Sequence, residues 1–235
     1  MKSMIINIER INGKTIPFAY NYYLATSFYL KLNLYQRDVR VLHSSYQVGM
    51  HTFSNIIHSD VKVENNGLNI ESGKIVFRSF DPRIDSYLRL GLAEDPFIRI
   101  LNTTFKVTSI YTGKEISFNS NKIDFKSLSP VLVKDWDKKN RFISDPEDLK
   151  DNLERLVVWS LEKKFLMKDP YVNINIKETK PKTVRLTSSK DNEVLTRGFN
   201  IKGSIETDIE SLKIIYYRGL GSKTSLGLGC IEVTE

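Results

Sequence analysis

The chain has 235 residues, a hydrophobic fraction of 40% and a formal net charge of +7. This fraction supports a packed core and excludes an intrinsically disordered chain. No apolar run reaches the roughly 18 residues that a membrane-spanning helix needs, and no signal-peptide core follows Met1. A single cysteine, Cys230, excludes an internal disulfide and a cysteine-based metal site. We therefore expect a cytoplasmic globular protein with no membrane association, whose basic charge suits a polyanionic partner.

The first half of the chain alternates between strand and helix signals. Residues 20–32 carry apolar side chains three and four positions apart, the spacing of one helix face, and Pro82 opens a second helical run. The strands expected around these helices lie at residues 5–8, from 51 onward, and at 74–78, 97–100 and 104–107. This β-α-β-β-α-β order is that of the split unit of the ferredoxin-like fold, whose sheet leaves one face free.

The second half repeats that order. A helix is expected from Asp145 to about Leu166, with Asp145 as cap and Pro146 in the first turn, and another helix opens at Asp208. Strands are expected at residues 123–125, 172–176, 184–186, 199–201 and 231–233. The chain is therefore predicted to be an α+β protein of two tandem ferredoxin-like (RRM-like, βαββαβ) domains, residues 1–115 and 116–235.

A glycine-rich segment from Arg218 to Cys230 holds four of the twelve glycines, as two Gly-Leu-Gly copies around a polar centre. Glycine takes backbone angles closed to other residues and leaves room for a ligand beside the main chain. The residues expected to contact phosphate groups here are Arg218, Gly219, Gly221, Ser222, Lys223, Thr224, Ser225, Gly227 and Gly229. A plain glycine-rich turn between a helix and the last strand is the alternative interpretation.

Two nucleotide-binding motifs are excluded at this segment. A Walker P-loop needs a Gly-Lys-Ser/Thr run, whereas Lys223 follows Ser222. The dinucleotide fingerprint needs an acidic residue about 20 positions downstream, and the sequence ends at Glu235.

Basic residues concentrate between Lys177 and Lys202, where seven lysines and arginines stand against three acidic residues. The segment is predicted to form two strands and their connection, so that much of this charge lies on one face. We expect Lys182 and Arg185 to bind a nucleic-acid backbone. A solvated hairpin would show the same pattern.

The order of Gly-Leu-Gly, a polar run with a lysine, Ser-Leu-Gly-Leu-Gly and a short apolar strand resembles the C-terminal signature of the RAMP superfamily of CRISPR-associated RNA-binding proteins. Within it, the arrangement looks most like the endoribonucleases that cut the CRISPR precursor transcript within each repeat. The Ser-Pro-Val stretch at residues 129–131 is similar to the mid-chain signature of that family. The resemblance implies CRISPR repeat RNA as partner, with a CRISPR effector complex or a second copy of the chain as further partners.

A ribonuclease that uses no metal needs one group to take the proton of the 2′-hydroxyl and another to protonate the 5′-oxygen. The resemblance implies His43 as general acid or base and Tyr29 as its helper, with a 2′,3′-cyclic phosphate and a 5′-hydroxyl as product ends. Gly49 stands where the family carries a lysine. His51 is therefore expected as the second proton-transfer group, with Lys31 as an alternative. No cluster of carboxylates suggests a metal, and we expect no cofactor.

Two other functions remain open. A non-catalytic RAMP RNA-binding subunit of a CRISPR effector complex would keep the fold and the glycine-rich segment without needing a histidine. A structural RNA chaperone with an RRM-like sheet shares the topology, although Arg197-Gly198-Phe199-Asn200 is only a fragment of the RRM aromatic octapeptide.

Overall fold

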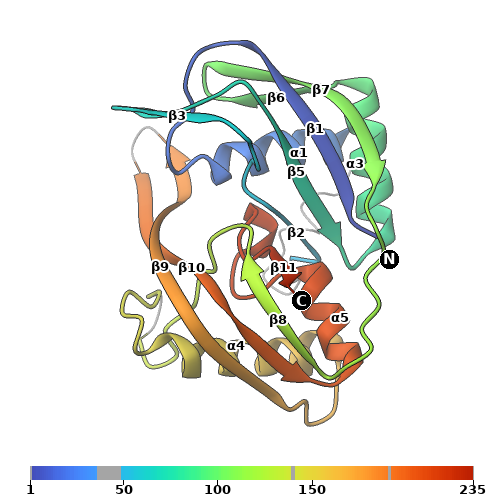
Figure 1. Ribbon diagram of the computed structural model, residues 1–235, viewed down its shortest axis with the longest axis vertical. Helices are drawn as coiled ribbons and strands as arrows, with labels where there is room; N and C mark the ends of the chain where they lie inside the picture. The colour runs from blue at the N-terminus through green and yellow to red at the C-terminus, as the bar shows by residue number, and fades with distance from the viewer. Residues whose placement is uncertain (1, 36–48, 139–140, 190–191, 235) are drawn as a thin grey trace.

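The computed structural model describes residues 2–35, 49–138, 141–189 and 192–234 of the chain. In this described part, four α-helices combine with three antiparallel sheets in an α+β fold. Figure 1 shows two layered halves, one above the other, in which the larger sheets face the viewer and helices such as α1 and α4 lie behind them. No helix of the described residues is both long and apolar enough to span a membrane.

The N-terminal half contains a five-stranded sheet in the order β2-β5-β1-β7-β6, and β3 and β4 form a separate hairpin. Its elements are β1 (Met4–Asn12), α1 (Asn21–Tyr35), β2 (His51–Phe53), β3 (Val61–Glu64), β4 (Gly67–Ile70), β5 (Ser72–Ser79), α3 (Pro82–Glu94), β6 (Phe97–Ile100) and β7 (Thr103–Thr112). The start of α3 is fixed by Pro82 and by the Asp81 carboxylate, which accepts the Arg83 N–H.

The predicted apolar stripe of the first helix is confirmed. Tyr20, just ahead of α1, and Leu24, Phe28 and Lys31 within it are each at most 3% exposed and face the sheet core. The core of this half is a cluster of buried side chains drawn from residues 4–107, separate from a second cluster drawn from residues 118–231. Each half therefore buries an apolar centre of its own.

The C-terminal half contains a four-stranded sheet in the order β11-β8-β10-β9. Its elements are β8 (Lys122–Ser127), α4 (Leu149–Phe165), β9 (Val172–Ser189), β10 (Asn192–Thr207), α5 (Ile209–Arg218), the 3-10 helix η1 (Thr224–Leu226) and β11 (Ile231–Thr234). The expected start of α5 is confirmed, because the Asp208 carboxylate accepts the Ser211 N–H at 2.9 Å.

Two expectations about this half were wrong. The Asp145 carboxylate accepts the Glu147 N–H in a separate turn, and α4 begins only at Leu149, which is completely buried. The core position of Leu149 sets the start of the helix, and the capping signal four residues earlier does not. The second concerns β9: residues 172–176 and 184–186 were expected as separate strands but belong to one strand, which pairs with β10 in a long hairpin. The two strands expected between Lys177 and Lys202 are confirmed.

Candidate functional site

The glycine-rich segment connects α5 to β11 and is held by its own backbone hydrogen bonds. The Leu220 N–H donates to the Gly229 carbonyl at 2.8 Å and closes the segment on itself. The Ser222 N–H donates to the Leu132 carbonyl at 2.7 Å, and the Gly229 N–H donates to the Pro130 carbonyl at 2.8 Å. These donors are committed to the fold, so a phosphate would have to bind other groups of the segment.

The four glycines of this segment have positive φ and are enclosed by protein atoms. A Cβ on Gly227 (φ 72°) would lie 2.0 Å from Cε2 of Phe53, and a Cβ on Gly229 (φ 69°) would lie 1.8 Å from the Leu220 carbonyl oxygen. We expected these glycines to admit a ligand. Instead, Gly227 lets Phe53 of β2 pack closely against the segment, and Gly229 lets the main chain of Leu220 do so, because the two halves of the molecule meet here.

The polar residues of the segment differ in exposure. Lys223 is exposed and has a left-handed backbone (φ 57°) directly before η1, whereas Thr224 is buried and Ser222 and Ser225 are half-buried. The ammonium group of Lys223 is therefore the cation that this segment presents to solvent.

Arg218 lies inside the molecule, although it was expected to contact RNA. Its side chain is 6% exposed, and its guanidinium group donates to the carbonyls of Gly219 at 3.4 Å and Gly221 at 3.5 Å. Burial lowers the pKa of Arg218 to about 10, so the group still carries its charge at neutral pH. This position indicates that Arg218 braces the glycine-rich segment from within.

Tyr29, His51 and η1 come together at the junction of the two halves. The rings of Tyr29 and His51 meet edge to face with 5.9 Å between centroids, and His51 stacks on Phe77 at 5.4 Å. His51 is only 3% exposed. Burial raises the pKa of the Tyr29 phenol, and a hydrogen bond with Ser225 lowers it in part. The phenol is therefore protonated at neutral pH and suited to donating a hydrogen bond.

His43 lies outside the described residues. The description resumes at Gly49, which lies against η1: a Cβ there would be 2.7 Å from Oγ1 of Thr224 and 2.9 Å from the Ser225 N. Gly49, where the family carries a lysine, thus lies directly against the glycine-rich segment. With the backbone in this position, there is no room for a side chain at Gly49.

Lys31 is committed elsewhere. Its side chain is buried, and its ammonium group pairs with the Asp95 carboxylate, which also accepts a hydrogen bond from Arg99 at 3.0 Å. The pair ties α1 to the end of α3, where Asp95 is the C-cap. Lys31 therefore supports the fold of the N-terminal half and is a poor substitute for a catalytic lysine.

This ion pair predicts a pH dependence of stability. Burial raises the pKa of Asp95, but the hydrogen bonds from Lys31 and Arg99 outweigh it and hold the pKa below its usual range. A depressed carboxyl pKa adds stability above the pKa of the unfolded chain, and that stability is lost as the pH falls. We expect the difference in unfolding free energy between wild type and Asp95→Asn to narrow between about pH 6 and about pH 3.

Urea unfolding at several pH values measures this difference. Glu71→Gln, which removes an exposed carboxylate, controls for the loss of one negative charge. A constant difference between wild type and Asp95→Asn over the whole range would show that the pair does not contribute as described.

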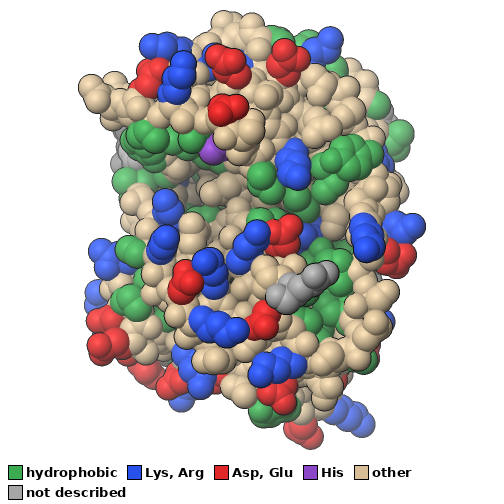
Figure 2. All heavy atoms as spheres, in the orientation of Figure 1, with side chains coloured by type: hydrophobic (Ala, Val, Ile, Leu, Met, Phe, Trp, Pro, Cys, Tyr) green, Lys and Arg blue, Asp and Glu red, His purple; other side chains and the backbone are tan. Residues whose placement is uncertain are grey.

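The hairpin of β9 and β10 has fewer unpaired basic side chains than its composition suggests. Three lysines of the C-terminal sheet pair with carboxylates of other strands in the same sheet: Lys126 with Glu232 at 2.9 Å, Lys177 with Asp124 at 2.8 Å, and Lys202 with Glu178 at 3.0 Å. Figure 2 shows the resulting mixture of basic and acidic side chains over the lower half of the molecule.

Lys182 and Arg185 occupy different environments on β9. Lys182 is exposed, opposite Gly198 of β10. Arg185 is half-buried and contacts α1 of the N-terminal half. Its guanidinium group lies 5.3 Å from the ring centroid of Tyr23 and donates to the Tyr23 hydroxyl at 3.1 Å. The stripe spacing of α1 includes Tyr23, but nothing in the sequence pairs it with Arg185.

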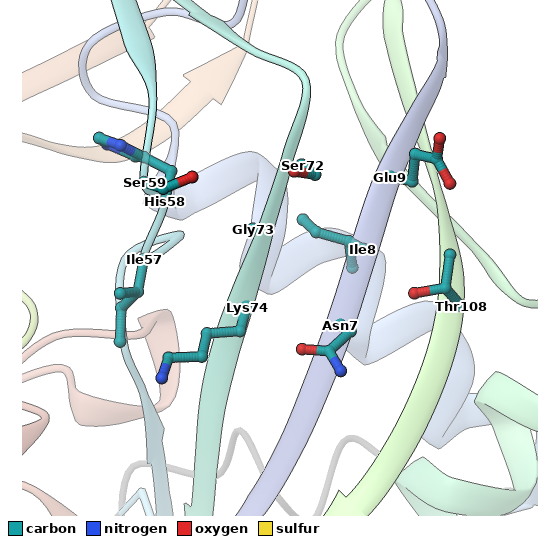
Figure 3. A pocket seen from close by; sticks show the side chains of 10 residues that line it. All are labelled: Asn7, Ile8, Glu9, Ile57, His58, Ser59, Ser72, Gly73, Lys74 and Thr108. Carbon is teal, nitrogen blue, oxygen red and sulfur yellow. The ribbon is translucent and has the colours of Figure 1, made fainter.

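His58 lies apart from the Tyr29 and His51 pair. It lines a shallow cavity of about 740 Å³ on the open face of the N-terminal sheet, together with Asn7, Glu9 and Lys74. Figure 3 shows Asn7 and Glu9 on one strand, Lys74 on the next, and His58 on the segment beside it. Within the described ranges, no three His, Cys, Asp or Glu side chains form a group that could hold a metal ion.

Residues 113–233, which are 121 of the 235 residues, match the sequence family described as CRISPR associated protein Cas6, C-terminal. The chain belongs to the Cas6 family. It is similar to an endoribonuclease-like Cas6 protein of Pyrococcus furiosus, with 28% identity over 95% of each chain. It is also similar to the CRISPR-associated endoribonuclease Cas6 1 of Methanocaldococcus jannaschii, with 22% identity over 98% of this chain and 92% of that one.

The Cas6 assignment agrees with the fold. A solved structure of a RAMP protein binding different RNA substrates has a TM-score of 0.84 with this chain, at 22% identity and with 100% of both chains covered. At this identity the likeness shows the fold alone. The family match and the curated relatives confirm the resemblance to CRISPR-associated RAMP endoribonucleases, and the matched region includes the whole glycine-rich segment.

Proposed function

We propose that this Cas6 protein cleaves CRISPR precursor RNA within its repeats without a metal ion, leaving a 2′,3′-cyclic phosphate and a 5′-hydroxyl. The observation that carries the proposal is the convergence of Tyr29, His51 and Ser225 at the glycine-rich segment, with Gly49 against the same segment. In the sequence, His43 precedes Gly49 by only six positions. One relative named as an endoribonuclease and one named as endoribonuclease-like match nearly the whole chain, which supports the same activity.

In this mechanism His43 accepts the proton of the attacking 2′-hydroxyl as general base or donates a proton to the departing 5′-oxygen as general acid, because an imidazole does either near neutral pH. Tyr29, protonated because of its raised pKa, donates a hydrogen bond to the phosphate as charge develops. We assign His51 to positioning Tyr29, since its imidazole is buried against that ring and Phe77. Lys223 and Lys182 supply exposed cations for the RNA backbone.

We also infer that residues 1–115 and 116–235 are two ferredoxin-like domains. The C-terminal half has the β-α-β-β-α-β order, and the N-terminal half has the same order with β3, β4 and β6 as additional strands. The shared strands lie in the corresponding orders β2-β5-β1-β7 and β9-β10-β8-β11. Two separate apolar cores support the same division. A CRISPR effector complex or a second copy of the chain stays a proposed partner beside the repeat RNA.

A cleavage assay with repeat RNA in EDTA tests the activity. We expect wild type to cut and His43→Ala to lose about two to four orders of magnitude in rate, the usual contribution of a general acid or base. His58→Ala is the matched control, because this histidine lines a different cavity. Cleavage by His43→Ala at the wild-type rate would remove the assigned role of His43.

A non-catalytic RNA-binding role is the second candidate, and the glycine at position 49 favours it. Its Cβ position is blocked by Thr224 and Ser225, so the family's lysine is missing from the site. A wild-type protein that binds repeat RNA tightly but leaves it intact would establish this role and refute the nuclease proposal.

A further inference from the structure

The two tryptophans of the chain are in edge-to-face contact and together line a groove on the helix side of the C-terminal sheet. Trp136 and Trp159 are 40% and 38% exposed, and their ring centroids lie 6.1 Å apart at an angle of 65°. Arg155, Val158 and Glu162 complete a groove of about 440 Å³, which we call the tryptophan groove. Exposed aromatic side chains around a groove mark protein interaction sites.

The tryptophan groove is preformed. Trp159 projects from the solvent side of α4, because the neighbouring Leu156, Val157 and Leu161 face the core. Trp136 is placed by its backbone N–H, which donates to Oδ1 of Asn152 at 3.1 Å. Asn152 is itself buried and donates to the Asp148 carbonyl at 2.9 Å. A partner would therefore meet a groove whose walls are already ordered, which reduces the entropic cost of binding.

An acidic pocket adjoins the groove and shares Arg155 with it. Its lining includes five carboxylates, those of Asp137, Glu147, Asp148, Asp151 and Glu154. Arg155 reaches Asp137 and Lys150 reaches Glu154, each at 4.0 Å, whereas Glu147, Asp148 and Asp151 have no cation within 4.0 Å among the described residues. This concentration of negative charge stands on a chain whose net charge is +7.

The charge of the acidic pocket selects the class of partner. Carboxylates repel a nucleic-acid backbone, and the described part of the chain groups no carboxylates in a way that could hold a metal ion. A basic protein segment is attracted by the same carboxylates, and its apolar side chains can pack in the groove against the exposed surfaces of the two indole rings. The open sheet face with the paired lysines lies on the other side of this sheet, away from α4 (Figure 1).

We propose that the tryptophan groove and its acidic pocket bind a protein segment that packs an apolar side chain against the exposed surfaces of Trp136 and Trp159 and sets lysines or arginines against Glu147, Asp148 and Asp151. The proposal stands independently of the nuclease activity, because none of these residues belongs to the cluster around Tyr29. It assigns this Cas6 protein a docking surface for a basic protein partner.

Tryptophan fluorescence reports on this groove alone, since the chain has no other tryptophans. The probe is a synthetic helical peptide of about 14 residues made of leucine and lysine, without aromatic residues. The comparison peptide replaces every lysine with glutamate. We expect the lysine peptide to shift the emission of wild type in a saturable way and the glutamate peptide to bind at least about tenfold more weakly.

Variants separate the groove from general surface attraction. Trp159→Ser keeps Trp136 as the fluorescent reporter. We expect this variant to bind the lysine peptide with an affinity at least about tenfold lower, as when a hot-spot residue of an interface is removed. Glu147→Lys combined with Asp151→Lys is expected to lower the affinity similarly. Val63→Ser, at an exposed apolar residue of β3, is the matched control and should bind as wild type does.

Three outcomes would overturn the proposal. The first is equal binding, or no binding, of the two peptides. The second is unchanged affinity in Trp159→Ser. The third is an emission shift produced by oligouridine or by raising the concentration of the protein alone, which would make the groove a site for RNA or for a second copy of the chain.

Discussion

Gly229→Ala is expected to lower the free energy of unfolding by about 3–6 kcal/mol. The methyl group would stand 1.8 Å from the Leu220 carbonyl oxygen, an atom of the main chain that cannot rotate away. The left-handed backbone at this position adds about 1–2 kcal/mol for any residue with a Cβ, and overpacking adds about 1–3 kcal/mol. Relief by movement would break the two hydrogen bonds that Gly229 makes to Leu220 and Pro130, at about 1 kcal/mol each.

Urea unfolding of purified protein measures this loss, and Gly113→Ala is its control. A Cβ on Gly113 meets its nearest neighbours at 3.4 Å, which is ordinary contact, so we expect a change of at most about 1 kcal/mol. Similar losses in the two variants would mean that the enclosure of Gly229 does not determine its effect. A Gly229→Ala protein as stable as wild type would refute the account of the glycine-rich segment given above.

The local elements were largely predictable from the sequence. The stripe of α1 and the starts of α3 at Pro82 and of α5 at Asp208 depend on residues within one or two turns, so spacing and helix-start signals identify them. The start of α4 was misplaced, because a capping signal at Asp145 competes with the burial of Leu149, and burial depends on the rest of the fold.

The candidate site was predictable only through the family resemblance. The resemblance selected Tyr29, and the glycine pattern drew attention to the segment that the structure brings to the same junction. The enclosure of Gly227 by Phe53 and the burial of His51 and Arg218 could not be predicted. These contacts join residues far apart in the sequence, and neither hydrophobic period nor motif spacing carries information about them.

Arg78 is the second residue whose loss should have a large effect, because it connects the two halves. It belongs to β5 and is 4% exposed, yet its guanidinium group lies 3.9 Å from the ring centroid of Tyr216 in α5. The same group donates to the carbonyl of Ile231 in β11 and contacts Sγ of Cys230 at 3.6 Å, and its Nε donates to Ser3 at 2.9 Å. One side chain from the N-terminal half thus satisfies groups of both α5 and β11.

Arg78→Ala is therefore expected to lower the free energy of unfolding by about 3–5 kcal/mol. The variant leaves the buried Ile231 carbonyl without its donor, removes the cation–π contact with Tyr216, and opens a cavity between the halves. Arg78→Lys should lose less than Arg78→Ala but remain below wild type, because an ammonium group keeps the charge without the planar fork that serves several partners.

Hydrogen exchange distinguishes this connecting role from a general loss of stability. Since Arg78 holds α5 and β11 to β5, exchange in Arg78→Ala should rise most in residues 209–218 and 231–234 and less in α1. Arg83→Ala is the control, because that side chain is 76% exposed in its pair with Asp81 and such pairs contribute at most about 1 kcal/mol. Uniform loss of protection through both halves would show that their union does not depend on Arg78 but on other contacts, such as the glycine-rich segment and the pair of Arg185 with Tyr23.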